Sequence, residues 1–289
     1  MATVRQFAPA KVNLYLHVVG RRPDGYHRLD SLVAFADVGD VVTAESDREL
    51  SLRVVGPYAG DLSDDDDNLV LKAAHALRAA AGMQRGARLT LRKNLPVASG
   101  IGGGSADAAA SLRALVRLWR LKVKPGVMAR IARGLGADVS ACLASQATFA
   151  TGIGERLTSA PGLPTLSAVL VNPGLALATP DVFKTRRGPF GSARPFAPAL
   201  LDGPALVTLL AARRNDLTDA AIRLQPTIAE VLRELATADC RLARMSGSGA
   251  TCYGIFSSDA AARRAARAIA ASRPRWWVKA TRLGSPDLD

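Results

Sequence analysis

The sequence has few residues that could form disulfides or bind a transition metal. Its 289 residues include three cysteines and three histidines. The cysteines (Cys142, Cys240 and Cys252) are odd in number and have no C-x-x-C spacing, so we expect neither a disulfide framework nor a thiolate zinc site. We expect them to be small buried hydrophobic residues. Three scattered histidines do not predict a metal cluster either.

The sequence also lacks a long hydrophobic run. A membrane-spanning helix needs about 18 consecutive apolar residues, and the run from Val12 to Val19 is interrupted by Asn13 and His17. The same run lacks the flanks and cleavage site of a signal peptide. Hydrophobic residues make up 48% of the chain and charged residues 22%, which excludes disorder throughout. We therefore expect a soluble, cytoplasmic protein of about two domains.

Acidic residues are fewer than basic ones. Lys and Arg number 38 and Asp and Glu 25, so the formal charge is 38 − 25 = +13. Such an excess suits nucleic acid, a membrane surface or a small anionic substrate, and the charge alone does not choose among them.

Apolar periodicity and turn residues predict mixed helices and strands in both halves of the chain. Predicted strands cover 13–19, 32–35, 41–44, 87–91, 166–171, 250–256 and 276–281, and predicted helices cover 68–81, 105–119, 126–135, 204–213, 227–237 and 259–271. Turns are expected at 22–25 and 38–40, and a stretch rich in Pro and Gly at 186–204 interrupts regular structure. We expect an α+β fold with mostly antiparallel sheets and two domains, 1–160 and 161–289.

Four glycines among residues 100–104 carry the strongest functional signal. They stand directly before a predicted helix, so they allow a tight turn whose bare N–H groups, with the helix N-terminus, can bind phosphate. No Lys follows the last glycine, which excludes a Walker A loop, and Ser105 replaces the final Gly of a dinucleotide-binding motif. The alternative is a flexible helix entry capped by Ser105.

Other candidate site residues allow a functional and a structural interpretation. Lys11 and Asn13 lie on one face of a strand, where Lys11 could reach a phosphate or could protect a sheet edge. Asp138 is a candidate general base or a helix N-cap. Residues 246–251 could form a second anion-binding turn or a plain β-turn. The acidic run 64–67 precedes a helix, where the macrodipole favours negative charge; metal binding is the weaker interpretation.

Taken in order, five motifs resemble those of the galactokinase, homoserine kinase, mevalonate kinase and phosphomevalonate kinase superfamily, and within it the family of 4-diphosphocytidyl-2-C-methyl-D-erythritol kinases. The similarity spans nearly the whole chain. The segment Asp24-Gly25-Tyr26-His27 is its most specific part. The motifs lie at residues 9–14, 22–27, 95–105, 136–139 and 246–250.

The resemblance implies a two-domain small-molecule kinase fold with the active site in the cleft between the domains. It implies ATP-dependent phosphorylation, with Mg²⁺, of the 2-hydroxyl of the cytidyl substrate, a step in non-mevalonate isoprenoid precursor synthesis. Asp138 would accept the hydroxyl proton, and Lys11 would keep Asp138 ionised and offset charge on the phosphoryl group. Asn13 would help to position the acceptor.

The resemblance also implies the binding residues. Tyr26 and His27 would bind cytosine, although His27 could instead be a core histidine. Thr179, Pro180 and Phe183 would belong to the second domain, closing over the substrate. Residues implied at the ATP site are Asn68, Leu69, Lys93, Pro96, Ala98, Gly100, Ile101, Gly102, Gly103, Gly104 and Ser105. Asp107 departs from the common family pattern. A carboxylate near phosphates must either face away from them or bind Mg²⁺. The metal ligands therefore stay unassigned.

Two competing hypotheses are weighed against this one. Arginines at 263, 264 and 267 beside Trp276 and Trp277 could bind nucleic acid, but they are more typical of a solvated helix face and of core-covering tryptophans. A kinase for homoserine or a mevalonate-type alcohol is disfavoured, because those acceptors have no base for Tyr26 and His27. We expect small-molecule partners only, no nucleic acid or membrane, and a monomer or weak homodimer.

Overall fold

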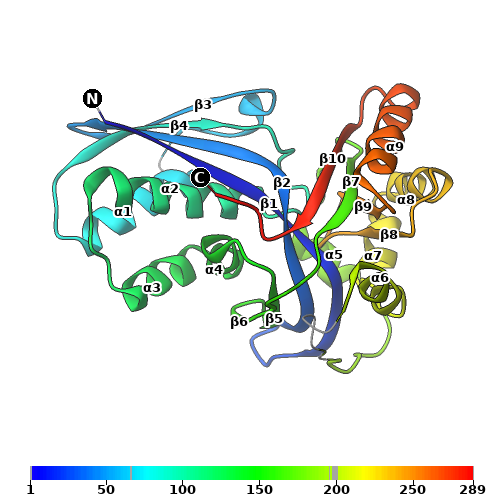
Figure 1. Cartoon of the computed structure of the whole chain (residues 1–289). Helices are drawn as coiled ribbons and strands as arrows, with labels where there is room; N and C mark the ends of the chain where they lie inside the picture. Colours follow the sequence, from blue (N-terminus) through cyan, green and yellow to red (C-terminus); the bar gives the residue numbers. More distant parts are fainter. Residues whose placement is uncertain (1, 66, 195, 197–200, 289) are drawn as a thin grey trace.

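Two long antiparallel strands run through the whole molecule. The computed structural model describes residues 2–65, 67–194, 196 and 201–288. Strand β1 (Thr3–Arg21) pairs with β2 (His27–Asp47) from Thr3 opposite Glu45 to Arg21 opposite His27 (Figure 1). The turn expected at residues 38–40 is wrong, because this segment lies inside β2. Gly39 faces Pro9, and a Cβ at Gly39 would lie 2.2 Å from the Ala8 carbonyl oxygen. This glycine therefore permits a close approach of two strands.

The strands form one continuous, mostly antiparallel sheet. Its order is β3-β4-β2-β10-β7-β9-β8, with β1 and β5 also paired to β2, and β6 paired to β5. Among these strand pairs β3 and β4 are parallel and the others antiparallel. The remaining strands are β3 (Leu50–Val55), β4 (Gly86–Arg92), β5 (Thr148–Gly152), β6 (Arg156–Ser159), β7 (Leu166–Asn172), β8 (Leu242–Met245), β9 (Cys252–Ile255) and β10 (Trp277–Gly284). The predicted α+β class is confirmed.

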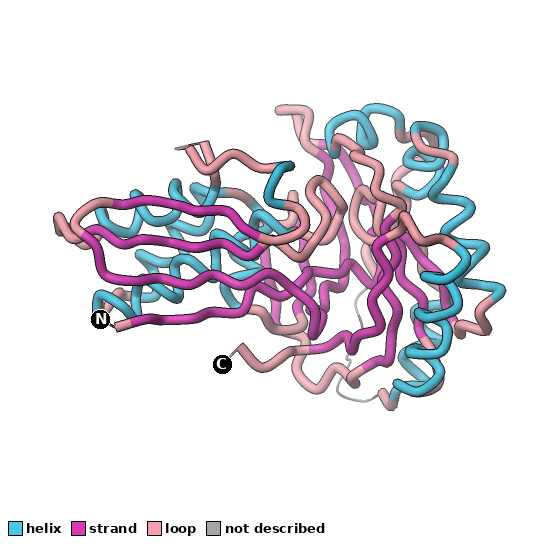
Figure 2. The backbone as a smooth tube through the Cα atoms, turned by 90° about the horizontal axis from the view of Figure 1, so that it is seen from above, coloured by secondary structure: helices cyan, strands magenta, loops and turns pink. Residues whose placement is uncertain are grey.

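Helices cover the sheet in two groups. Helices α1 and α2 lie against the part of the sheet formed by β1–β4, with α3 packed on α1 and α4, and α8 and α9 lie against β7–β10 (Figures 1 and 2). Helix α2 packs against the sheet with a buried face that is rich in alanine, and such small side chains permit a close approach. The helices are α1 (Leu69–Ala80), α2 (Gly103–Trp119), α3 (Pro125–Leu135), α4 (Ala137–Ala144), α5 (Thr179–Thr185), α6 (Gly203–Ala211), α7 (Thr218–Leu224), α8 (Thr227–Thr237) and α9 (Asp259–Ser272), with a short 3-10 turn at Ala59–Asp61.

The predicted helices are all present, but several short elements were missed. Helix α2 starts two residues earlier than predicted, and β3, β5, β6, β8, α5 and α7 lacked a clear pattern. The boundary expected near residue 160 falls between β6 and β7 and stays a prediction. Of the stretch predicted to be irregular, 186–204, residues 195 and 197–200 lie outside the described residues, as does Asp66 in the acidic run. Within the described ranges, no helix is both long and apolar enough to cross a bilayer.

The tryptophans next to the basic C-terminal helix pack on the hydrophobic core. Arg263, Arg264 and Arg267 are exposed on α9. Trp276 and Trp277 are half-buried and pack against hydrophobic core clusters, and the Arg273 guanidinium lies 5.1 Å above the Trp276 ring. The tryptophans thus cover the core instead of presenting a stacking surface beside the arginines.

Candidate active site

A cavity of about 1410 Å³ is lined by both halves of the chain. Its walls come from β1 and β2, the glycine loop before α2, the start of α4, helix α5 and the turn at residues 246–248. All the site residues predicted from the sequence line it except Asn68 and Ile101. Asn68 caps α1, its side-chain oxygen accepting a hydrogen bond from the Val70 N–H, while Ile101 is fully buried in the core. Their neighbours Leu69, Gly100 and Gly102 reach the cavity.

The glycine loop leaves the N-terminus of α2 open to the cavity. Gly102 is the N-cap, with φ +63°, and no side chain caps the helix. Ser105 therefore does not act as the cap that the alternative interpretation required. The first N–H groups of α2, at Gly103, Gly104 and Ser105, belong to residues that line the cavity. Uncapped N–H groups and the positive end of the helix dipole together favour an anion here.

The loop is fastened to both halves of the molecule. The Ile101 carbonyl accepts the Lys11 N–H at 2.9 Å, and the Gly100 carbonyl accepts the Ser246 hydroxyl at 3.1 Å. Gly100 has φ +73°, and a Cβ there would lie 2.5 Å from the Gly249 carbonyl oxygen. Because the two glycine-bearing turns pack backbone against backbone, a larger residue does not fit between them.

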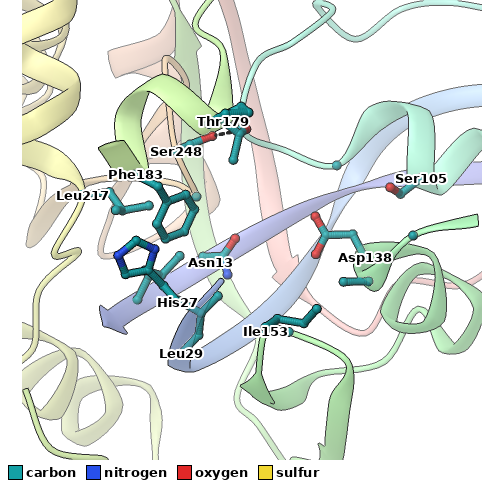
Figure 3. A pocket seen from close by; sticks show the side chains of 18 of the residues that line it. Asn13, His27, Leu29, Ser105, Asp138, Ile153, Thr179, Phe183, Leu217 and Ser248 are labelled. Carbon is teal, nitrogen blue, oxygen red and sulfur yellow. Dashed lines mark hydrogen bonds between the residues drawn. The ribbon is translucent and has the colours of Figure 1, made fainter. Parts of the chain in front are cut away.

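A Lys–Asp ion pair lies between the two ends of the cavity. The Lys11 Nζ donates to Asp138 Oδ1 at 2.8 Å and to Asn13 Oδ1 at 3.3 Å. Asn13 is oriented for this contact, because its Nδ2 donates to the Ser31 hydroxyl at 2.8 Å. Lys11 is buried, whereas the Asp138 side chain is 45% exposed. Lys11 is therefore not an exposed lysine that protects a sheet edge. Asp138 is not an N-cap, because it lies in the first turn of α4 and faces the cavity (Figure 3).

Asp107 faces away from the cavity into a buried charge cluster. The Lys93 Nζ donates to Asp40 Oδ2 at 2.5 Å and to Asp107 Oδ2 at 2.8 Å, and all three side chains are buried. Burial raises the pKa of Asp107 to about 8, and Lys93 opposes that rise. Burial alone would lower the pKa of Lys93, but the two carboxylates raise it above its usual value. The cluster joins β2, the end of β4 and α2 beneath the glycine loop.

The opposite end of the cavity is aromatic. His27 stacks on Phe183, with ring centroids 5.1 Å apart and an angle of 22° between the planes (Figure 3). Tyr26 also lines the cavity and is 62% exposed. Burial and the nearby guanidinium groups of Arg21 and Arg186 lower the pKa of His27, so its imidazole is neutral near pH 7. His27 is thus a cavity residue and not a core histidine.

The cavity also contains residues that the sequence interpretation did not assign. Gly247 and Ser248 lie in the second glycine-bearing turn, and the Ser248 hydroxyl shares a hydrogen bond of 2.8 Å with the Thr179 hydroxyl (Figure 3). That turn was singled out as a possible anion site, so its composition was a usable signal. Arg186 and Phe190 belong to the irregular stretch after α5, which has no pattern that marks a site.

The fold is that of a GHMP kinase, a small-molecule kinase. Residues 68–146 match the GHMP kinases N terminal domain and residues 200–274 match the GHMP kinases C terminal domain. A solved structure of 4-(cytidine 5'-diphospho)-2C-methyl-D-erythritol kinase is 37% identical, with a TM-score of 0.81, over 98% of this chain and 100% of that one. A homoserine kinase from Cytophaga hutchinsonii shares the fold, with a TM-score of 0.72 at 17% identity, over 100% of this chain and 98% of that one.

Relatives of nearly equal length identify the family. The 4-diphosphocytidyl-2-C-methyl-D-erythritol kinase of Paramagnetospirillum magneticum is 52% identical over 96% of this chain and 97% of its own. The kinase of the same name from Rhodospirillum rubrum is 49% identical over 97% and 93%. This chain belongs to the family of 4-diphosphocytidyl-2-C-methyl-D-erythritol kinases. It is a phosphotransferase that uses ATP and acts on an alcohol group.

Proposed function

We propose that this enzyme transfers the γ-phosphoryl group of ATP to the 2-hydroxyl of 4-diphosphocytidyl-2-C-methyl-D-erythritol, in non-mevalonate isoprenoid precursor synthesis. One observation carries the proposal: a single cavity has an anion-binding helix N-terminus at one end, an imidazole with aromatic rings at the other, and a Lys–Asp pair between them. A triphosphate and a nucleobase-bearing acceptor match these two ends. The names of the relatives support the same acceptor.

The Lys11–Asp138 pair would carry the transfer. The acceptor oxygen forms a bond to the γ-phosphorus while the bond to the leaving ADP oxygen breaks, and the hydroxyl proton moves to the Asp138 carboxylate. Asp138 Oδ1 is held by Lys11. The Lys11 ammonium, oriented by Asn13, would offset the negative charge on the moving phosphoryl group. The chain thus contributes alignment and charge compensation more than covalent chemistry.

Each end of the cavity would hold one substrate. The α2 N–H groups at residues 103–105 would bind the ATP phosphates, and Leu69, Lys93, Pro96 and Ala98 would contribute to the nucleotide wall. Tyr26 and Phe183 would flank the cytosine and His27 would hydrogen-bond to it. Thr179 and Pro180, at the start of α5, would border the acceptor. In this arrangement residues 1–160 hold ATP and residues 161–289 close over the acceptor.

The residues beside the glycine loop fit a magnesium ion. Mg²⁺ usually binds through one or two protein oxygens together with substrate phosphates, and it would supply charge neutralisation of the triphosphate. Ser105 brings a hydroxyl oxygen to this end of the cavity (Figure 3). The described part of the chain contains no group of three His, Cys, Asp or Glu side chains that could hold a metal. Phosphate oxygens and water would therefore complete the coordination.

A panel of acceptors tests the proposal. ADP release is measured with ATP, Mg²⁺ and either the cytidyl substrate, homoserine or mevalonate, each at the same concentration. We expect turnover of the cytidyl substrate alone. Turnover of homoserine or mevalonate without turnover of the cytidyl substrate would contradict it. A filter-binding titration with DNA serves as a second arm, and we expect no salt-dependent binding of the kind a nucleic-acid protein shows.

The enzyme is proposed to be cytoplasmic and a monomer or weak homodimer.

A further inference from the structure

Residues 186–191, which follow helix α5, place an aromatic side chain, Phe190, in the cavity wall. The proposed reaction gives this side chain no role. Phe190 is 49% exposed and, like Tyr26, it is a large exposed aromatic residue that lines the cavity. A half-exposed phenylalanine leaves apolar surface in water. A ligand that covers this surface gains binding free energy from its removal from water. The position of Phe190 at the cavity therefore indicates contact with a bound molecule.

Phe190 lies beside His27, whose imidazole is predicted to bind the base. Its ring centroid lies 6.3 Å from that of His27, with an angle of 60° between the planes, an edge-to-face arrangement. Phe183 contacts the same imidazole by stacking. A planar ring that hydrogen-bonds to His27 consequently meets an aromatic environment built by Phe183 and Phe190 as well as by Tyr26.

The segment is held in place by its own arginine. The Arg186 guanidinium lies 5.1 Å above the Phe190 ring, and it donates to the carbonyl oxygens of Gly188 at 3.0 Å and Pro189 at 2.5 Å. The Gly191 N–H donates to the Val18 carbonyl of β1 at 3.0 Å. A planar guanidinium can stack and donate two hydrogen bonds at once, which a lysine cannot do. Because the segment is already ordered, binding does not have to order it.

We propose that Phe190 is a specificity-determining residue for the acceptor, a further aromatic wall that contacts the pyrimidine base of the nucleoside diphosphate substrate, and that Arg186 is its positioning residue. This inference rests on the proposed function. The glycine loop and α2 lie at the other end of the cavity, so Phe190 acts on acceptor binding and not on ATP binding.

Substitution of Phe190 tests the inference. Stacking of a base on an aromatic ring contributes to binding affinity. Removal of the Phe190 ring should therefore weaken binding of the cytidyl substrate about tenfold. We expect Phe190→Ala to raise KM for the cytidyl substrate about tenfold, with kcat and KM for ATP within twofold of wild type. Phe190→Trp should keep KM within threefold, because it retains a stacking face. Arg186→Lys should raise KM for the acceptor about threefold without moving KM for ATP.

Leu224→Ala provides a matched control. Leu224 is another exposed large hydrophobic residue, but it does not line the cavity, so this variant should match wild type in every constant. An unchanged acceptor KM in Phe190→Ala overturns the inference. Equal increases in KM for ATP and for the acceptor also overturn it, because they indicate a general distortion of the cavity.

Binding of CMP separates this inference from the proposed function. Calorimetry with CMP needs no turnover, and we expect Phe190→Ala to weaken CMP binding about tenfold relative to wild type. If wild type does not turn over the cytidyl substrate but binds CMP in a Phe190-dependent way, the proposed reaction is wrong and the base-binding role stands. If turnover occurs and neither KM nor CMP binding depends on Phe190, only the inference about Phe190 fails.

Discussion

Replacing Lys93 by methionine should destabilise the protein by about 3 kcal/mol. The Lys93 side chain is 2% exposed, and its ammonium donates to Asp40 and Asp107. Methionine keeps most of the side-chain volume and removes the charge, so the Asp40 carboxylate stays buried without a cation. Removing one partner of a buried ion pair typically costs about 3–5 kcal/mol. The lower figure applies here, because Asp40 keeps hydrogen bonds from the N–H groups of Asn94 and Leu95.

Urea unfolding followed by tryptophan fluorescence measures this loss. Trp119 is a suitable probe, because it lies in α2, the helix that also carries Asp107, and is buried in the core. Its indole N–H donates to the Gly86 carbonyl at 3.2 Å. With an m-value of about 3 kcal/mol/M, the midpoint should fall by about 1 M. Such a change is a large part of the 5–15 kcal/mol typical of folded proteins.

Asp107→Asn is the matched control for Lys93→Met. Burial raises the pKa of Asp107, so loss of its charge costs less than loss of the Lys93 charge, and the amide oxygen of Asn can still accept the Lys93 hydrogen bond. This variant should lie within about 1 kcal/mol of wild type at pH 7. The reasoning is refuted if Lys93→Met is as stable as wild type, or if Asp107→Asn costs as much as Lys93→Met.

Three further predictions follow from the same geometry. First, the folded state holds the Asp107 proton up to a pH of about 8 while the unfolded chain releases it near pH 4, so this group should make wild-type stability fall as pH rises between these values. Urea midpoints across that range should show a flatter profile in Asp107→Asn, and an identical slope would count against the raised pKa. Second, Asp138→Asn should lower kcat by about 10²- to 10⁴-fold, because the proton acceptor is lost, with KM for ATP within threefold; a coupled ADP assay checks both, and a wild-type rate would exclude Asp138 as the base. Third, Gly100→Ala should lower the thermal midpoint and weaken ATP binding, because its Cβ would lie 2.5 Å from the Gly249 carbonyl oxygen, while Gly60→Ala, with no atom within 4 Å, should match wild type. Equal midpoints and equal ATP affinities for the two variants would contradict this packing argument.

Local signals explain which elements could be predicted. The helix at residues 227–237 is found at the predicted residues, because its apolar periodicity reflects burial of one face. The strands β5 and β6 were missed, since five and four residues are too few to show a clear alternation of apolar and polar positions. Gly39 was misread as a turn, because glycine also serves close strand contacts, and only the register of β1 against β2 reveals that role.

Local sequence patterns were enough to predict the glycine loop before α2, the α+β class and, through the motifs, most of the predicted site residues that line the cavity. Which charges meet depends on tertiary packing. Lys11 and Asp138 are 127 residues apart in the chain, and Asp107 faces Lys93 and Asp40 instead of a phosphate. The reason is physical: backbone conformation follows from neighbouring residues, whereas the partner and the burial of a charged group follow from how distant segments pack.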